Sequence, residues 1–143
     1  MDANVQKAKA CLFQGDYTCV LCKGNEIFTS NHRGVKPLLD FLNSNNDFSS
    51  FSAADKVVGK ATAFLYCLLG IKSLYAQVLS VPAKEVLLDR GILVSYDTLV
   101  PGIRNRENTG PCPMEYATRD CQTPEQALTA IQKTLKDLQA NSR

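Results

Sequence analysis

The chain has 143 residues, of which 45% are hydrophobic and 21% are charged, and its formal net charge is +2. This length and balance predict one globular domain over residues 1–143 and exclude an intrinsically disordered chain. The net charge is too small to indicate a nucleic-acid-binding protein by itself. No apolar run of about 18 residues predicts a membrane span, and the first residues lack the apolar stretch of a signal peptide. We therefore expect a cytoplasmic protein with no membrane partner.

The six cysteines are expected to be mostly reduced thiols, because cytoplasmic chains rarely carry a disulfide framework. Cys19 and Cys22 have the spacing of redox and zinc motifs. They lie in a strand-like run, however, where side chains three positions apart point to opposite faces of a sheet. We interpret both as buried small hydrophobic residues.

The first half of the chain predicts a helix within 1–16, then a β-hairpin, then two helices. The hairpin turns at "KGN", because Gly-Asn favours a tight turn between strands. A helix over 35–45 is expected, with Pro37 in its first turn. The stretch 51–70 predicts the strongest helix, with Ser52 and Asp55 as an N-terminal capping box and an apolar stripe at Val57, Ala61, Phe64, Leu65 and Leu68.

The second half alternates strands and helices. Residues 73–80 are apolar on both faces, as in a central strand, and are followed by a helix over 82–91, a strand over 92–100 and a loop over 101–110. Another helix starts at "GPCPMEYA", and the last one, over 123–143, is capped by Thr123. This order predicts an α/β fold, a three-layer α/β/α sandwich with a mixed β-sheet.

Two expected helix starts carry the residues with reactive or charged side chains. "SAADKVVGKA" contains Asp55, Lys56 and Lys60, and "GPCPMEYA" contains Cys112 and Glu115. Helices on one face of such a sheet can bring their N-termini together, where free N–H groups favour an anion or a thiolate. Pro113 is expected at the first helical position, with Cys112 at the cap and its sulfur facing those N–H groups.

These stretches resemble the cytidine deaminase superfamily, in which a [His/Cys]-x-Glu motif and a P-C-x-x-C motif hold a zinc ion. The sequence more closely resembles a domain-of-unknown-function family of small, mostly prokaryotic proteins assigned to this fold. The matching phrases include "ADKVVGKA", "LYAQVLS" and "NRENTGPCPMEYA". The resemblance implies a cytidine-deaminase-like fold and no established activity.

The sequence departs from the zinc pattern in both motifs. Ala53 stands at the first ligand position, Asp55 at the position of the proton-shuttling acid, and Glu115 in place of the second cysteine. A catalytic zinc normally has three protein ligands, and only Cys112 and Glu115 remain as candidates. We therefore expect no metal and no cofactor. His32, the only histidine, is interpreted as a solvent-facing turn residue.

The candidate catalytic residues are Asp55, Lys56, Cys112 and Glu115, and the candidate ligand-binding residues are Lys60, Arg104, Asn105 and Arg106. Two arginines beside two helix starts favour a phosphate or carboxylate ligand. Each feature also has a plain structural interpretation, because both acids can be helix caps and the arginines can belong to an ordinary polar loop.

Three functions stay open at this point. The first is a zinc-independent enzyme with Cys112 as the nucleophile, acting on a nucleotide-like substrate. The second is a non-catalytic module that binds an anionic or nucleotide-like small molecule, and the third is a protein-interaction module. The sequence leaves a homo-oligomer open.

Overall fold

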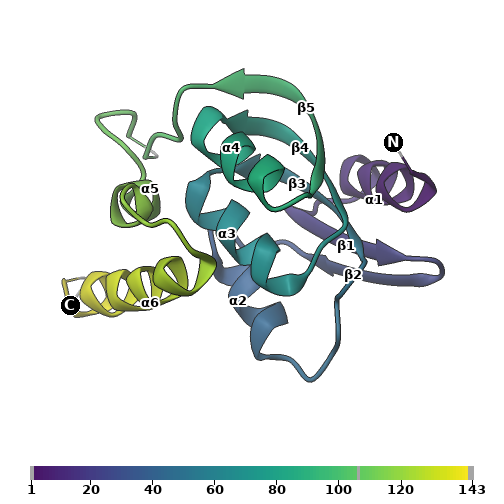
Figure 1. Ribbon diagram of the computed structural model, residues 1–143, viewed down its shortest axis with the longest axis horizontal. Helices are drawn as coiled ribbons and strands as arrows, with labels where there is room; N and C mark the ends of the chain where they lie inside the picture. Colours follow the sequence, from purple (N-terminus) through teal and green to yellow (C-terminus); the bar gives the residue numbers. More distant parts are fainter. Residues whose placement is uncertain (1, 106, 142–143) are drawn as a thin grey trace.

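The computed structural model, which describes residues 2–105 and 107–141, shows a five-stranded mixed sheet between layers of helices (Figure 1). The strands lie in the order β2-β1-β3-β4-β5 and comprise β1 Cys19–Lys23, β2 Glu26–Ser30, β3 Ser52–Val58, β4 Ser73–Ser80 and β5 Leu93–Val100. Strand β1 pairs antiparallel with β2 and β3, whereas β3, β4 and β5 are parallel. The three-layer α/β architecture predicted from the sequence is confirmed.

The helices are α1 Ala3–Gln14, α2 Lys36–Asn43, α3 Lys60–Leu69, α4 Val81–Asp89, α5 Pro113–Thr118 and α6 Pro124–Asn141. Helix α1 covers one face of the sheet, while α2, α3 and α4 lie on the other face and α5 and α6 pack beyond α3 (Figure 1). The predicted hairpin, both later strands and the helix with Pro37 in its first turn are confirmed. The Thr123 hydroxyl caps α6 as predicted, by accepting from the N–H of Gln126 at 3.2 Å.

Each face of the sheet has its own buried core. On the α1 face the core contains Val5, Ala8 and Leu12 from the helix and Cys22 from β1. The larger core on the opposite face contains Cys19 from the same strand. The two cysteines therefore point to opposite faces, which confirms their interpretation as buried small residues.

The helix predicted over 51–70 is wrong in its first half. Residues 52–58 form β3, and α3 begins only at Lys60, after Gly59 as its N-cap. Ser52 and Asp55 therefore form no capping box, and the Ser52 hydroxyl instead bonds to that of Ser73 at 2.8 Å. The strand lies at the centre of the sheet, so its backbone hydrogen bonds go to β1 and β4, and this tertiary pairing overrides the helical apolar spacing.

After the edge strand β5, the chain turns back so that α5 starts near the end of the central strand β3. Strand β5 is an edge strand with exposed Leu93, Tyr96 and Leu99. The loop that follows leads to α5, which packs against α3 and α6 and so brings Cys112 back to the end of β3. Within the part of the chain that the structure describes, no helix combines the length and apolarity needed to span a membrane.

Candidate functional site

A cavity of about 560 Å³ lies between the carboxyl end of β3, the starts of α3 and α5, and the segment 31–37. Its deeper wall is made of buried residues that include Cys19, Asp55, Ala61, Thr62 and Met114. Exposed residues, among them Asp16, His32 and Arg33, form its rim. All four candidate catalytic residues, Asp55, Lys56, Cys112 and Glu115, line this cavity. The fold thus brings together side chains that are up to sixty positions apart in the sequence (Glu115 and Asp55).

Asp55 reaches the cavity from the middle of a strand. Its Cα lies opposite that of Cys19 in the β1–β3 ladder, and the residue is only 8% exposed. The Asp55 carboxylate accepts hydrogen bonds from the Tyr66 hydroxyl at 2.6 Å and from the N–H of Val57 at 3.2 Å. Burial raises the pKa of Asp55 to about 7, although these hydrogen bonds oppose the shift. The Asp55 carboxyl can therefore gain or lose a proton near neutral pH, as a general acid or base requires.

Two further side chains continue this network into the core. Tyr66, on α3, is fully buried, and its hydroxyl lies 3.2 Å from the Cys19 sulfur. Burial raises the pKa of Tyr66 and of Cys19 well above their ordinary values, and the nearby Asp55 carboxyl adds to both shifts. Both groups therefore stay protonated at neutral pH. The sequence did not reveal this pair, because a tyrosine and a cysteine on apolar elements look like core residues.

Glu115 joins the starts of α3 and α5. Its Oε1 accepts a hydrogen bond from the backbone N–H of Lys60 at 2.6 Å, so that Glu115 caps α3 from the neighbouring helix. This close approach requires Gly59, because an added Cβ there would lie 1.6 Å from the same oxygen. Burial raises the pKa of Glu115, and the bond to Lys60 partly offsets that shift. The two helix starts do meet, but the first of them is at Lys60 and not at Asp55.

Cys112 lies at the N-cap of α5, with Pro113 at the first helical position, as the sequence predicts. The residue is half-buried and lines the cavity. Its sulfur makes no side-chain capping hydrogen bond to α5, so the expected contact with the free N–H groups of that helix is wrong. The Cys112 backbone N–H donates to the carbonyl of Ile103 at 2.9 Å, which fixes the loop against the cavity.

The described residues of the predicted anion clamp, Lys60, Arg104 and Asn105, do not line the cavity. The Lys60 Nζ donates to the carbonyl of Arg119 at 2.7 Å, and Lys60 lies outside the lining of the cavity. Arg104 donates to the side chain of Asn108 at 2.6 Å, and the amide nitrogen of Asn105 donates to the Thr109 hydroxyl at 3.1 Å. These bonds hold Arg104 and Asn105 within their own loop, away from the cavity lining. Arg106, the other arginine of the clamp, lies outside the described residues.

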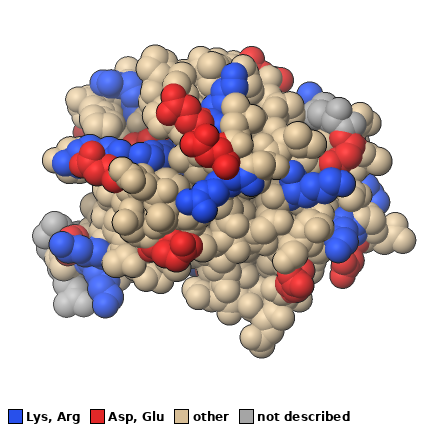
Figure 2. All heavy atoms as spheres, in the orientation of Figure 1, with Lys and Arg blue, Asp and Glu red and all other residues tan. Residues whose placement is uncertain are grey.

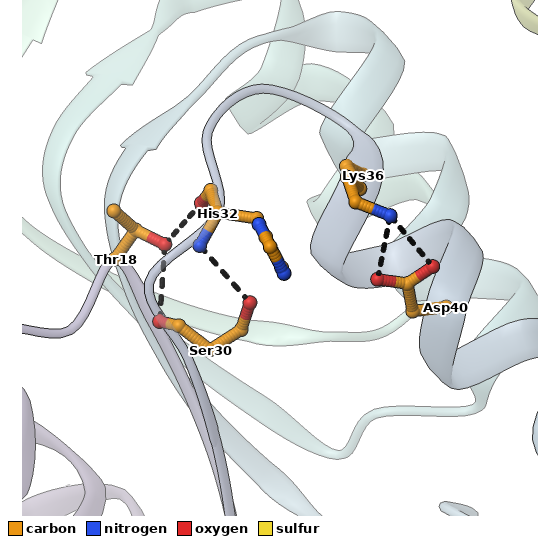
Figure 3. A network of polar contacts seen from close by, with 5 residues as sticks. All are labelled: Thr18, Ser30, His32, Lys36 and Asp40. Atoms are coloured by element: carbon orange, nitrogen blue, oxygen red, sulfur yellow. Dashed lines mark hydrogen bonds and ion pairs between the residues drawn. The ribbon is translucent and has the colours of Figure 1, made fainter.

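Other basic side chains border the cavity instead. They are His32 and Arg33, which follow the hairpin, and Lys56, whose N–H donates to the carbonyl of Thr18 at 3.1 Å. His32 is exposed, as expected, and its backbone is held by Ser30 and by the hydroxyl of Thr18 (Figure 3). The figure shows its ring directed away from Thr18. The signal that could have revealed this rim is the polar stretch "NHRG" between the hairpin and Pro37.

The residues at the helix starts do not fit a zinc ion. In the described part of the chain, no group of three or more His, Cys, Asp and Glu side chains could hold a metal. Glu115, at the position of the missing cysteine, is engaged by the Lys60 N–H, and Asp55 is engaged by Tyr66. A catalytic zinc needs about three ligands on one centre, and these carboxylates are directed to other partners.

Comparisons with known proteins place the chain by family. The family model described as "TM1506: Domain of unknown function (DUF1893)" matches residues 7–135. The crystal structure of a DUF1893 family protein (TM1506) from Thermotoga maritima is similar over 93% of this chain and 91% of that chain, with a TM-score of 0.84 and 24% sequence identity. No curated protein matches the chain. The chain therefore belongs to the DUF1893 family, a domain of unknown function.

Proposed function

We propose that the Asp55 cavity binds a small molecule that carries an anionic group, such as a nucleotide-like compound or a carboxylate. The observation that supports this most is that a protonatable carboxyl, Asp55, and the basic residue Arg33 line the same cavity of about 560 Å³. Ligand pockets in proteins usually combine apolar walls with a few convergent polar groups. Ala61, Met114 and Ile103 supply such walls here.

The cavity also contains the groups for chemistry without a metal. Cys112 is the candidate nucleophile, and its sulfur would form a bond to an electrophilic carbon of the ligand. The thiol proton would pass to the ionised Asp55 carboxylate, and the displaced group would leave with its bonding electrons and accept that proton from Asp55. Arg33 at the rim would stabilise the negative charge that develops on the ligand. In the alternative function the same cavity binds its ligand without reaction, or the domain acts as a protein-interaction module.

The surface charge favours a small ligand over nucleic acid. On the face shown in Figure 2, Lys and Arg side chains are interspersed with Asp and Glu. Nucleic-acid-binding proteins usually concentrate basic residues in one stripe or patch. The net charge of +2 agrees with this balance.

A thermal-shift screen with nucleosides, nucleotides and small carboxylates tests the binding proposal. We expect a subset of the anionic compounds to raise the melting temperature of the wild type, because a ligand that binds only the folded state stabilises it. Asp55→Asn and Cys112→Ser should weaken the shift, whereas Cys11→Ser on α1, which lies on the opposite face of the sheet, should preserve it. Shifts that are unchanged in every variant would contradict the assignment of the cavity.

Catalysis is tested separately from binding. A compound that shifts the melting temperature is incubated with the protein, and its covalent adduct or product is sought by mass spectrometry. An adduct on Cys112 that Cys112→Ser abolishes would support the enzyme. Binding that persists in Cys112→Ser, with no product from the wild type, would favour the non-catalytic module.

A further inference from the structure

The carboxyl of Asp55 is buried beside the cavity with no cationic partner. Its hydrogen-bond donors are the Tyr66 hydroxyl and backbone N–H groups, all of which are uncharged. Among the described residues, no basic side chain forms an ion pair with Asp55. Buried charges in proteins are normally paired, because an isolated ion loses its hydration without compensation. The ionised form of Asp55 is therefore uncompensated, and a cation on its cavity side would stabilise that form.

The neighbouring elements do not supply that charge. The titratable groups that border the cavity near Asp55 are Cys19 from β1, Glu115 from α5, and Asp16, His32, Arg33 and Lys56. Cys19 stays a neutral thiol and Glu115 is an acid, so the groups on the deeper wall bring no positive charge. Arg33 and His32 are exposed at the rim. The deeper end of the cavity is thus acidic, and its rim carries His32 and Arg33 together with the acid Asp16.

We propose that the cavity binds a bifunctional ligand, with a cationic nitrogen group placed against Asp55 and an anionic group placed at the rim beside Arg33. This inference rests on the proposed function and adds the charge and the orientation of the ligand. A guanidinium, amidinium or protonated aromatic amine has the chemistry for the inner position, because it presents N–H donors together with positive charge. A phosphate or carboxylate suits the outer position.

The acceptor capacity of Asp55 permits this contact. An ionised carboxylate offers about four lone-pair sites. The structure assigns Oδ2 to the Tyr66 hydroxyl and Oδ1 to the Val57 N–H, and the Lys56 backbone also donates to the carboxyl, which leaves lone-pair capacity for a further donor. Tyr66 also fixes the plane of the carboxylate from the side of the core. A planar cation with two N–H groups can therefore bond to the cavity side of the Asp55 carboxylate.

Three probes that share a four-carbon chain test the cationic and the anionic end of the ligand separately. They are 4-guanidinobutyrate, which has both charges, butylguanidine, which has only the cation, and butyrate, which has only the anion. Calorimetric titration should show 4-guanidinobutyrate binding at least about tenfold more tightly than butyrate, the scale expected for one charge-assisted contact. Asp55→Asn should abolish this advantage. Arg33→Ala should weaken the binding of 4-guanidinobutyrate and leave the affinity for butylguanidine unchanged.

The pH dependence gives a second measurement. Because only the ionised Asp55 carboxylate attracts the cation, butylguanidine should bind about tenfold more tightly at about pH 8 than at about pH 6 when the pKa of Asp55 is about 7. His32 also borders the cavity, so the comparison is made against Asp55→Asn, which keeps His32. Asp40→Asn, on the exposed face of α2, is the matched control and should behave as the wild type does.

The outcomes distinguish this inference from the proposed function. If butyrate and nucleotides bind and the guanidinium adds no affinity, the ligand orientation is wrong while the anion-binding cavity stands. If butylguanidine binds through Asp55 and no anion binds, the proposed function fails and the cationic site stands. If none of the three probes binds the wild type at millimolar concentration, the cationic site is overturned.

Discussion

Glu115 caps a helix to which it does not belong: its Oε1 accepts the backbone N–H of Lys60 at 2.6 Å and so joins the first turns of α5 and α3. Glu115→Ala should lower the free energy of unfolding by roughly 1 kcal/mol, the usual cost of a lost N-cap. Glu115→Gln keeps an acceptor oxygen and should lose less. Urea denaturation of the three proteins measures this difference, and equal losses in both variants would argue that the capping bond contributes little.

Gly59→Ala should destabilise the protein through the same contact. The new methyl group would lie 1.6 Å from Glu115 Oε1, so the Glu115 side chain must move and the cap is lost. We expect a loss of roughly 1–3 kcal/mol, the range of overpacking in a buried site. In the double variant Gly59→Ala/Glu115→Ala the costs should not add, because the clash with the carboxylate is gone. Strict additivity in the denaturation experiment would contradict this arrangement.

Asp55→Asn should stabilise the protein above neutral pH. The pKa of Asp55 is about 7 in the fold and 3.8 as its ordinary value, so the folded state holds the proton more tightly than the unfolded state does. The stability linked to this proton is complete at low pH and is lost as the pH rises through about 7. Asparagine has no proton to lose, and we expect it to gain roughly 1–3 kcal/mol over the wild type above neutrality.

The measurement is the difference in unfolding free energy between wild type and Asp55→Asn at successive pH values from acid to alkaline. The difference should grow as the pH rises from about 3.8 to about 7 and level off above that. Asp40→Asn reports the effect of removing an exposed acid. A difference that is constant across this range would mean that the folded Asp55 has an ordinary pKa.

Tyr66→Phe should raise the pKa of Asp55 further. The Tyr66 hydroxyl donates to the carboxylate at 2.6 Å and thereby favours its ionised form against the effect of burial. Carbon-13 NMR of labelled aspartates, with Asp55→Asn to assign the resonance, would report the shift. Tyr75→Phe is a control, since that tyrosine bonds to Asp97 on β5 instead. An Asp55 pKa unchanged by Tyr66→Phe would show that the hydroxyl does not stabilise the carboxylate.

Alkylation should distinguish the cysteines that border the cavity. Cys112 is half-buried at the mouth, whereas Cys19 is 1% exposed and burial raises the pKa of its thiol well above the ordinary value. Iodoacetamide should therefore modify Cys112 in the folded protein and Cys19 only after unfolding. Peptide mass spectrometry against time resolves the sites. Modification of Cys19 at the rate of Cys112 in the folded protein would contradict the described cavity wall.

The sequence predicted most elements because their local signals agree with the fold. Pro37, Thr123 and the Gly24–Asn25 turn act within a few residues, and the structure has each in the expected place. Strand β3 was misassigned because Ala53 and Ala54 favour a helix, and because the stripe from Val57 onward has helical spacing. Both alanines are fully buried between the two helical layers, a reason for small side chains that only the assembled sheet reveals.

The sequence identified four residues that line the cavity, but the candidate ligand-binding residues that the structure describes lie outside its lining. Asp55, Lys56, Cys112 and Glu115 meet in one cavity, although Asp55 was expected on a helix and lies on a strand. Arg104 does not line the cavity, because its guanidinium bonds to Asn108 within a local turn. Tyr66 could not be identified from the sequence, since its hydroxyl meets Asp55 only after α3 packs onto the sheet.

The walls of the cavity are drawn from residues 16 to 115, and the last of them is the short helix α5. On the ribosome, a nascent chain with every strand already emerged still lacks this wall. A ligand would therefore recognise only a finished molecule, in which α5 and α6 have docked onto α3. Ligand binding should then slow protease cleavage in the loop 101–112, because Ile103 and Cys112, near its two ends, line the cavity and bond to each other.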